Sequence, residues 1–315
     1  MPSVDASSPV PAPSGRQFLL TAGRYAATIT EVGATIRTCT WNDLPIIAGF
    51  AADAICDGGH GQLLAPWPNR VDHGRYEFHG AARQLDLSEP DNDNAIHGLV
   101  RWEPWTCASH EENRVTLAHR LFPRPGYPHV LDLRVTYALD AATGLSVELI
   151  AMNAGVDPAP WGTGHHPYLT PGLDSVRECT LRLPASSYLV VDDRMIPQRS
   201  EPVGGTAYDF RDGRGIGTTP LDPPFGDLAR GEDGHAVAEV VAPDGARTAL
   251  WCDQSYGWLQ VFTGHTLAPY RRFQAIAVEP MSCPPDAYNS GRDLVVLDPA
   301  ASWTGRWGVA FAPAP

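Results

Sequence analysis

The sequence contains no lysine. All 23 basic residues are arginines, set against 36 acidic residues in a chain of 315 residues, so the formal net charge is −13. A protein without a lysine amine cannot form a Schiff base through that side chain, attach pyridoxal phosphate or provide the lysine of a P-loop. The acidic excess makes nucleic acids and anionic membranes poor partners. It does not argue against a neutral polar ligand.

Long hydrophobic runs are also missing. No segment approaches the roughly 18 apolar residues of a membrane span, and residues 1–15 have neither the basic start nor the apolar stretch of a signal peptide. We therefore expect a soluble, cytoplasmic protein without a membrane partner. Residues 1–15 are expected to form a disordered tail rich in Pro, Ser and Ala, and residues 16–315 to form a single domain.

The six cysteines are scattered along the chain without a CxxC pair. In a chain of this length we expect six free thiols rather than a disulfide framework. Cys283 follows Glu279 by four residues. We expect it to be the thiol nearest to any site built on that carboxylate, and to pack beneath the site without taking part in chemistry.

The clearest pattern in the sequence has a period of two. Apolar and polar residues alternate between 131 and 139 and again between 145 and 149, after a turn at 140–144, which predicts a hairpin. Further strands are expected at 115–121, 179–183, 259–263, 275–278 and 294–297, and long loops at 192–235. No helical stripe is free of Gly and Pro, which occur 30 times each. We therefore predict an all-β fold, a sandwich or barrel.

Four single polar residues stand out, and each is also open to a purely structural interpretation. Arg70 follows a proline-rich turn that could aim its planar donors into a cleft. His97 precedes a glycine, and Asp222 precedes two prolines, as many turn residues do. Glu279 directly follows the apolar run 275–278, where burial of a carboxylate costs free energy unless the group is paired or used.

A pair of adjacent histidines, His165 and His166, adds a fifth feature. On an extended segment their side chains face opposite ways, so at most one enters a given site, which argues against both binding one metal ion. A single histidine can act as a general acid or base near neutral pH. Trp67, Trp161 and Trp258 lie beside these polar stretches, and a flat apolar face next to hydrogen-bonding groups suits a sugar ring. For most of the nine tryptophans, packing in the core is the plainer interpretation.

Taken together, these stretches resemble the aldose 1-epimerase (galactose mutarotase) family over residues from about 20 to 310. The segments that carry the resemblance, in the order of the family, are Gly61-Gln-Leu-Leu-Ala-Pro66-Trp-Pro-Asn69-Arg70, Gly74-Arg-Tyr76-Glu-Phe78-His-Gly80, Asn94-Ala-Ile-His97-Gly98-Leu99, His165-His166-Pro-Tyr168 and Glu279-Pro280-Met-Ser-Cys-Pro-Pro-Asp286-Ala-Tyr-Asn289. The family implies a large antiparallel β-sandwich, often called a supersandwich, with a sugar site in a cleft on one face.

The resemblance also implies an activity and a set of site residues. The activity is interconversion of the α and β anomers of a free aldohexose of the glucose or galactose type, without a metal or cofactor. The implied catalytic residues are Glu279 (base), His166 (general acid) and His97, and the candidate substrate-binding residues are Arg70, Asp222, Asn69 and Trp161.

The sequence departs from the family pattern in two places. Where many members read Asn-His-x-Tyr, this chain has two histidines before Tyr168. Alignment on the tyrosine selects His166 as the acid, and His165 is expected to point away from the site. Val261 is expected to replace an aromatic residue that supports the sugar in other members.

Three other functions stay open, as does the oligomeric state, monomer or homodimer. A non-catalytic sugar-binding module on the same fold would keep Arg70 without needing both His166 and Glu279. A cupin-type metal enzyme would need a compact His-x-His pattern on adjacent strands. A hexose-phosphate 1-epimerase would need several cations around the phosphate, for which Arg271 and Arg272 are the candidate cluster.

Overall fold

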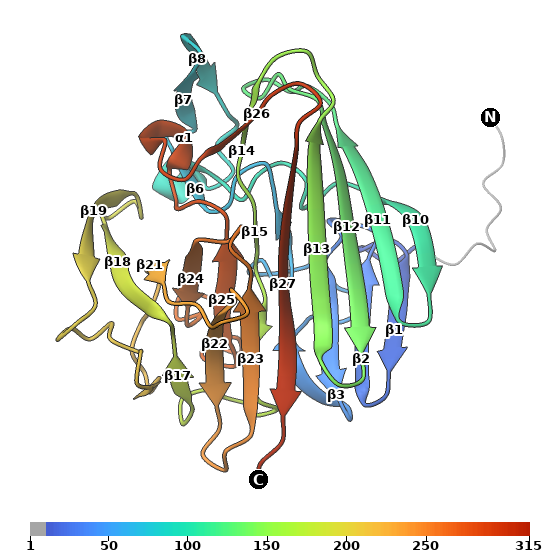
Figure 1. The fold of residues 1–315 in the computed structure, drawn as a ribbon, viewed down its shortest axis with the longest axis vertical. Coiled ribbons are helices and arrows are strands. Elements are labelled where there is room, and N and C mark those ends of the chain that lie inside the picture. Colours follow the sequence, from blue (N-terminus) through green and yellow to red (C-terminus); the bar gives the residue numbers. More distant parts are fainter. Residues whose placement is uncertain (1–10) are drawn as a thin grey trace.

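The computed structural model describes residues 11–315. Within this range the strands form two large antiparallel sheets, one of twelve strands and one of nine, and three ribbons of two strands (Figure 1). The twelve-stranded sheet contains β1 (Gln17–Ala22), β2 (Tyr25–Thr30), β3 (Ile36–Trp41), β4 (Leu44–Ala48), β16 (Tyr168–Leu169), β25 (Ile276–Met281), β24 (Trp258–Phe262), β21 (Pro224–Leu228), β18 (Ala185–Val191) and β19 (Pro197–Pro202) in this order, with β5 (Leu63–Leu64) and β15 (Gly164–His165) off the main path.

The nine-stranded sheet lies against the first. Its strands, in spatial order, are β10 (Thr106–Glu111), β11 (Arg114–Leu121), β12 (Leu131–Asp140), β13 (Gly144–Asn153), β27 (Ser302–Ala312), β23 (Arg247–Cys252), β22 (Ala236–Val241), β17 (Thr180–Arg182) and β20 (Arg214–Gly215). The ribbons pair β14 (Ala159–Trp161) with β26 (Val295–Leu297), β6 (Arg70–Asp72) with β9 (Asn94–Ile96), and β7 (Arg75–Phe78) with β8 (Ala81–Gln84). The described helices are the 3-10 turn η1 (Pro90–Asn92) and α1 (Ala287–Ser290).

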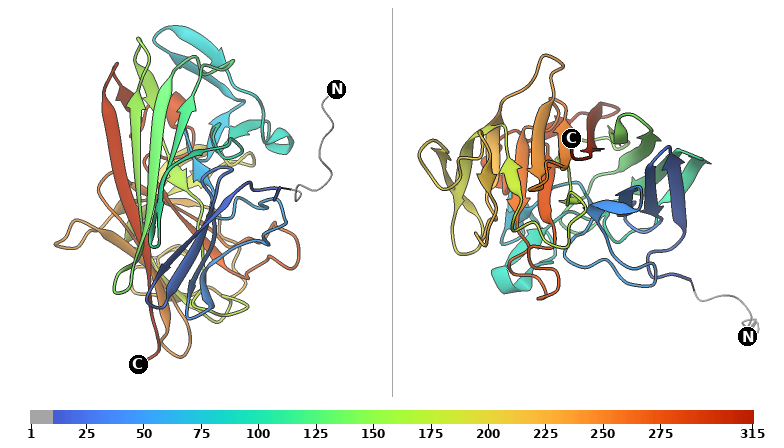
Figure 2. Two further views of the ribbon diagram at one scale, coloured as in Figure 1. Left: turned by 90° about the vertical axis from the view of Figure 1, so that its right-hand side faces the viewer. Right: turned by 90° about the horizontal axis from the view of Figure 1, so that it is seen from below.

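The hydrophobic core lies between the two large sheets. Figure 2 shows β1 and β2 running beside β11 to β13, and β1 contacts both β11 and β12. The core cluster draws Phe18, Leu20 and Ile29 from one sheet and Val135 and Leu149 from the other. Both sheets therefore bury one face against each other, as the alternation of apolar and polar residues requires.

The predicted hairpin is confirmed. β12 and β13 pair in register from Leu131 opposite Asn153 to Asp140 opposite Gly144, and residues along β12 are alternately buried and more exposed. The predicted strands at 115–121, 179–183, 259–263, 275–278 and 294–297 correspond to β11, β17, β24, β25 and β26. The prediction of a β-sandwich is confirmed with them.

The expectation of long loops at 192–235 is only partly right. The short strands β19, β20 and β21 lie within this stretch. β19 pairs with the preceding strand β18, whereas β20 pairs with β17, and β21 with β18 and β24, which lie farther away in the sequence. Residues 1–10 of the expected tail lie outside the described residues. At the end of that tail, the carbonyl of Ser14 accepts a hydrogen bond from the Val32 amide, and the division into tail and domain stays a prediction.

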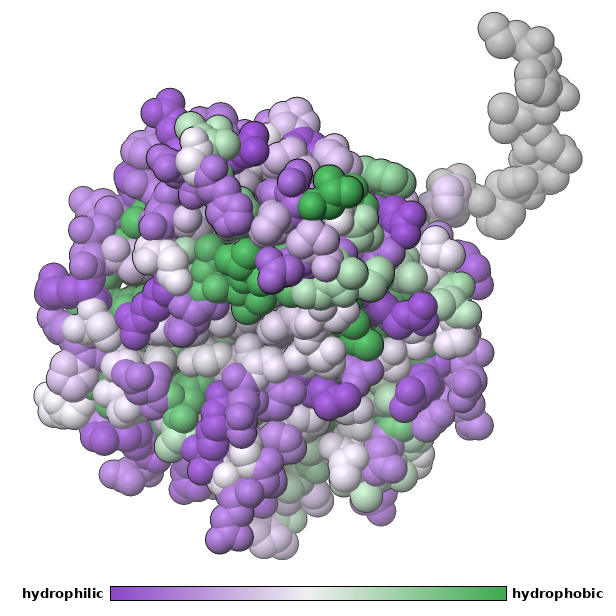
Figure 3. All heavy atoms as spheres, turned by 45° about the horizontal axis from the view of Figure 1, so that its top comes forward, coloured by the Kyte–Doolittle hydropathy of each residue, from purple (hydrophilic) through white to green (hydrophobic). Residues whose placement is uncertain are grey.

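The molecular surface seen in Figure 3 is mainly hydrophilic, and hydrophobic residues reach this face in a few separate groups. No helix among the described residues is long and apolar enough to cross a membrane. The six cysteines are all unpaired, as predicted.

The core of the sandwich generates a stability prediction. Leu149 lies on the central strand β13 and is 0% exposed, so Leu149→Ala should lower the free energy of unfolding by about 2–5 kcal/mol, through lost burial and the cavity left behind. Urea unfolding measures the change. The matched control, Val156→Ala, changes a side chain that is 87% exposed and should stay within about 0.5 kcal/mol of the parent. Equal effects of the two substitutions would contradict this placement of the core.

Candidate functional site

Glu279 lies in the middle of β25, a strand buried along its whole length. Successive side chains of a strand face opposite sides, and here Val278 packs in the core while Glu279 faces the other way, opposite Gln260 of β24. Val261, the cross-strand partner of Val278, is fully buried in the same core. The expectation that Val261 takes the place of an aromatic sugar support is therefore wrong, because its side chain lies on the core side of the sheet.

The two adjacent histidines point to opposite sides of the twelve-stranded sheet, as predicted. His165 enters the core, where its Nδ1 accepts a hydrogen bond of 3.1 Å from the indole N–H of Trp307. His166 lies on the other side, and its Nε2 is 3.3 Å from Oε1 of Glu279. The histidine beside the carboxylate is thus the one that alignment on Tyr168 selects.

Arg70 and His97 are brought together by the ribbon β6–β9. Asn69 has a positive φ of 53° immediately before β6, and His97 has a positive φ of 63° immediately after β9. The amide of His97 donates to the carbonyl of Asn69 at 2.9 Å, and this hydrogen bond holds the two bends together. The imidazole of His97 then lies edge-on to that of His166, with ring centroids 5.5 Å apart.

The Arg70 guanidinium is held by a carboxylate from a distant loop. Its Nε and Nη2 each donate to Glu89 at 2.8 Å, in the two-pronged geometry that fixes the plane of the guanidinium. Burial works against the charge on Arg70, but the hydrogen bonds to Glu89 and the nearby charges of Asp222, Glu89 and Glu279 outweigh it and raise the pKa of Arg70. Arg70 therefore stays charged beside both carboxylates of the site.

Asp222 reaches the cluster from the loop before β21. The side-chain amide of Gln260 donates to its carboxylate at 2.6 Å and to its main-chain carbonyl at 2.8 Å. Burial raises the pKa of Asp222 to about 6, although Arg70 and Gln260 oppose the shift. Gln260 is also the cross-strand neighbour of Glu279, so the residue that holds Asp222 lies next to Glu279 in the sheet.

The ionisable groups in this cluster are almost completely buried, and burial disfavours their charged forms. It raises the pKa of Glu279 well above its usual value, helped by the charge of Asp222. It lowers the pKa of His166 to about 3 and also lowers the pKa of His97. At neutral pH the Glu279–His166 pair therefore holds one proton, and His97 is uncharged.

Several buried polar atoms in the cluster have no hydrogen-bond partner among residues 11–315. They are Oε2 of Glu279, Nδ1 of His166, Nδ1 of His97 and Oε1 of Gln260. A buried polar atom without a partner costs about 1–3 kcal/mol, so four of them in one place need a common explanation. A ligand with several hydroxyl groups, able to donate and accept, provides one.

The structure thus brings together six of the seven predicted site residues: Glu279, His166, His97, Arg70, Asn69 and Asp222. The seventh, Trp161, is fully buried and packs against Trp303, with ring centroids 5.9 Å apart. Its contact with a sugar stays a prediction. Cys283 is fully buried and burial raises its thiol pKa to about 12, so it is protonated at neutral pH.

Sequence reasoning missed three residues of the cluster. Gln260 lies within a predicted strand, but only the register of β24 against β25 places it opposite Glu279. Glu89 carries no local signal, because its role depends on the approach of a loop 19 residues away from Arg70. Tyr168 belongs to a recognised motif, and the structure shows its ring stacked on His166 at 4.9 Å.

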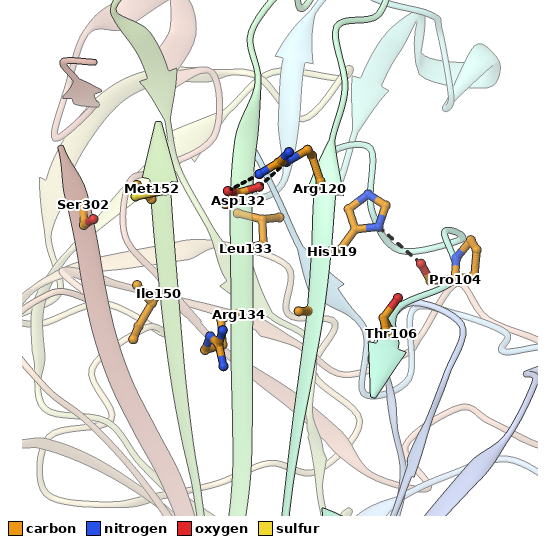
Figure 4. A pocket seen from close by; sticks show the side chains of 11 residues that line it. Pro104, Thr106, His119, Arg120, Asp132, Leu133, Arg134, Ile150, Met152 and Ser302 are labelled. Carbon is orange, nitrogen blue, oxygen red and sulfur yellow. Dashed lines mark hydrogen bonds and ion pairs between the residues drawn. The ribbon is translucent and has the colours of Figure 1, made fainter. Parts of the chain in front are cut away.

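Among the hollows on the molecular surface, two help to locate the site. The larger, of about 600 Å³, is on β10 to β13 and β27, and none of the seven predicted residues lines it (Figure 4). Of the polar side chains drawn there, Arg120 is paired with Asp132, and His119 with the carbonyl of Pro104. The other, of about 440 Å³, borders Asp222 beneath β18 and β19, and so adjoins the cluster.

The fold and the cluster define an antiparallel β-sandwich protein with a buried carboxyl–imidazole pair. The sequence profile of aldose 1-epimerase matches residues 16–309, and the chain belongs to that family. It is similar to the uncharacterised protein YihR of Escherichia coli, with 36% identity over 285 residues and 90% of each chain covered. It is also similar to an aldose 1-epimerase of Haemophilus influenzae, with 28% identity over 260 residues and 73% of each chain covered.

A solved structure shares the fold. The GalM/aldose epimerase homologue from C. elegans superimposes with a TM-score of 0.85 at 19% sequence identity, covering 95% of this chain and 99% of the other. The family resemblance inferred from the sequence is confirmed by these comparisons.

The Arg70–Glu89 pair generates a prediction about the site. The side chains of Arg70 and Glu89 are only 11% and 20% exposed, so Glu89→Gln should lower the free energy of unfolding by about 1–3 kcal/mol by leaving a charged group short of a partner. The control is Asp132→Asn, which removes the partner of the 55% exposed Arg120 and should cost about 0–1 kcal/mol. Urea unfolding compares the two. A Glu89→Gln variant as stable as the control would contradict the buried ion pair.

Proposed function

We propose that this protein is an aldose 1-epimerase that interconverts the α and β anomers of a free aldohexose of the glucose or galactose type. The observation that carries the proposal is the approach of His166 Nε2 to within 3.3 Å of Glu279 Oε1 in a buried site. Each of these side chains keeps a further polar atom without a partner among the described residues. An acid and a base side by side, both able to reach a ligand, are what anomer exchange requires.

Anomer exchange opens and closes the hemiacetal ring. Glu279 takes the proton of the C1 hydroxyl while His166 gives a proton to the ring oxygen, and the C1–O5 bond breaks to leave the open-chain aldehyde. Rotation about C1–C2 turns the other face of the aldehyde toward O5. The ring then closes with His166 removing the proton from O5 and Glu279 returning one to the C1 oxygen.

Burial prepares both groups for this exchange. A carboxylate with a raised pKa is a stronger base, and an imidazolium with a lowered pKa is a stronger acid. After ring opening the proton lies on Glu279 and His166 is neutral, which is the arrangement that burial favours. The reactive arrangement, with Glu279 ionised and the proton on His166, forms when the one shared proton passes from Glu279 to His166 across the 3.3 Å between Oε1 and Nε2, and the attraction between the two opposite charges offsets part of its cost.

The remaining residues suit the task of holding the sugar while C1 turns. Arg70 offers guanidinium donors fixed by Glu89, and neutral His97 and Gln260 each present a buried polar atom. Asp222, fixed by Gln260, can accept from a hydroxyl. Anchoring several hydroxyls keeps the open chain in place for re-closure.

The other functions are less well supported. A sugar-binding module has no need for an imidazole and a carboxylate in contact, yet both are present. For a hexose-phosphate epimerase, the expected cations are engaged elsewhere: Arg271 pairs with Asp57 at 2.8 Å, and Arg272 donates to the carbonyl of Leu267. A free sugar is therefore the better substrate.

The first prediction from this mechanism concerns the acid and the base. Glu279→Gln and His166→Asn should each slow mutarotation by about 10²–10⁴-fold, because each removes one partner of a coupled proton transfer. The double variant should be little slower than either single one. Polarimetry on freshly dissolved α-D-glucose and α-D-galactose, corrected for the spontaneous reaction, measures the rates.

A control separates binding from catalysis. Arg70→Ala should act mainly through KM, since its contacts exist in the ground state and the transition state alike. Near-normal mutarotation by Glu279→Gln would remove the catalytic assignment and make the sugar-binding module the better proposal.

The second prediction concerns pH. The pair is active with one proton, so activity falls at low pH when His166 is protonated beside a protonated Glu279, and at high pH when both have lost their protons. Because the pKa of His166 is lowered from 6.5 to about 3, kcat should persist well below pH 6.5 and fall only in more acid solution.

Asp222 has a separate effect on the pH profile. Its pKa of about 6 should appear in KM as the pH falls, and Asp222→Asn should abolish that inflection while leaving the acid limb of kcat in place. An acid limb of kcat at the ordinary pKa of histidine would show that His166 is not held in the environment described.

A further inference from the structure

The catalytic imidazole lacks the hydrogen bond that usually fixes such a ring. In many sites the second ring nitrogen of a functional histidine bonds to a carboxylate or carbonyl, which sets its tautomer and orientation. Here Nδ1 of His166 has no partner outside its own residue among the described part of the chain. Something other than a hydrogen bond must hold the ring at 3.3 Å from Glu279.

A neighbouring stretch of main chain meets this need. The amide of Gly61 donates to the carbonyl of His166 at 2.9 Å, and the amide of His166 donates to the carbonyl of Gln62 at 3.0 Å. The carbonyl of Gly58 accepts a hydrogen bond of 2.7 Å from the hydroxyl of Tyr168. Residues 58–62 therefore form hydrogen bonds with the main chain of His166 and with the side chain of Tyr168, whose ring stacks on His166. We call this segment the cradle.

Gly59 is the point where the cradle touches the imidazole itself. A Cβ atom at this position would lie 2.9 Å from Cδ2 and 3.2 Å from Nε2 of His166, and φ of Gly59 is +77°. The ring cannot simply swing aside, because Tyr168 lies against its face at 4.9 Å and His97 against its edge at 5.5 Å. Glycine thus lets bare main chain pack against the edge of the ring that bears Nε2.

His60 supports the arrangement from the far side of Tyr168. Its ring stacks on Tyr168 with centroids 3.9 Å apart and an interplanar angle of 13°, so the tyrosine is enclosed between His60 and His166. The Nδ1–H of His60 donates to the carbonyl of Asp57 at 2.7 Å. Burial lowers the pKa of His60 to about 4, so this ring is neutral and adds no charge near the pair.

The cradle is also tied to a second loop. The carboxylate of Asp57 accepts from Arg271 at 2.8 and 3.1 Å and from the hydroxyl of Tyr270 at 3.2 Å. Arg271 is only 11% exposed and donates also to the carbonyl of Gly49. The segment is thus fixed at its start by an ion pair and at its end by the strand-like bonds to His166.

We propose that residues 58–62 are the positioning element for the general acid, with Gly59 and His60 as positioning residues that act through His166. This inference rests on the proposed function, in which His166 is the acid. Close packing against the cradle fixes the orientation of the His166 imidazole, a role that a hydrogen bond to Nδ1 has in other sites. Neither Gly59 nor His60 exchanges a proton with the sugar.

The test compares Gly59→Ala in two backgrounds. In the parent protein the substitution should lower kcat about 10- to 100-fold with little change in KM, since displacement of a catalytic group by about 1 Å costs this much. In the His166→Asn variant, assayed at raised protein concentration, the same substitution should change kcat by less than about twofold, because a residue that acts through an absent group has nothing left to act on.

The matched control is Gly205→Ala. Gly205 has the same φ of +77°, and a Cβ there meets no atom within 4 Å, so it reports the cost of an alanine at positive φ without the contact. Its kcat should stay within about threefold of the parent. Equal losses from Gly59→Ala with and without His166 would overturn the proposal, as would a Gly59→Ala variant as active as Gly205→Ala.

A second pair of variants covers the case in which Gly59→Ala does not fold. His60→Ala should lower kcat by about 3- to 10-fold by removing the ring behind Tyr168, and His60→Phe, which keeps a flat ring without the hydrogen bond, should restore most of it. Failure of His60→Phe to exceed His60→Ala would overturn the role of the stack. If His166→Asn itself left mutarotation unchanged, the proposed function would fail first, and the two failures are thereby distinguished.

Discussion

The site depends on one close contact, that of a carboxylate and an imidazole buried side by side on the twelve-stranded sheet. Removing Glu279 and His166 from water disfavours the charged form of each, so their pKa values move in opposite directions. The same burial makes the carboxylate a stronger base and the imidazolium a stronger acid. A sandwich with 43% hydrophobic residues supplies the apolar surroundings that produce this effect, which links the composition of the chain to the chemistry we propose.

The surroundings of the pair are built to keep it in place. Beneath Glu279, the opposite face of β25 is anchored in the core through Val278 and its neighbour Val261. Beside it, Glu89 fixes Arg70, and Gln260 fixes Asp222. Around His166, main chain and stacked rings replace the missing hydrogen bond. In the mechanism that we propose, packing orders the acid, and paired charges and amides order the groups that would bind the sugar.

The sequence predicted those features that depend on local pattern. Period-two alternation identified the hairpin of β12 and β13 and the opposite orientation of His165 and His166, and a carboxylate at a buried strand identified Glu279. It did not predict the features that depend on register between distant strands. No short motif encodes the pairings that place Gln260 opposite Glu279, Glu89 beside Arg70, and residues 58–62 against the main chain of His166. Val261 was misplaced for the same reason, because its face of the strand is decided by the partner strand.

The most direct test of the central claim follows both anomers at equilibrium. NMR exchange spectroscopy, observed on ¹H, resolves the C1 protons of the α and β forms of glucose and of galactose. It measures how fast magnetisation passes between the two forms. If the buried pair opens and closes the ring, the exchange rate for at least one of these sugars will rise in proportion to the concentration of the native protein and return to the spontaneous rate after heat denaturation. Binding of both sugars with no increase in exchange would contradict the account.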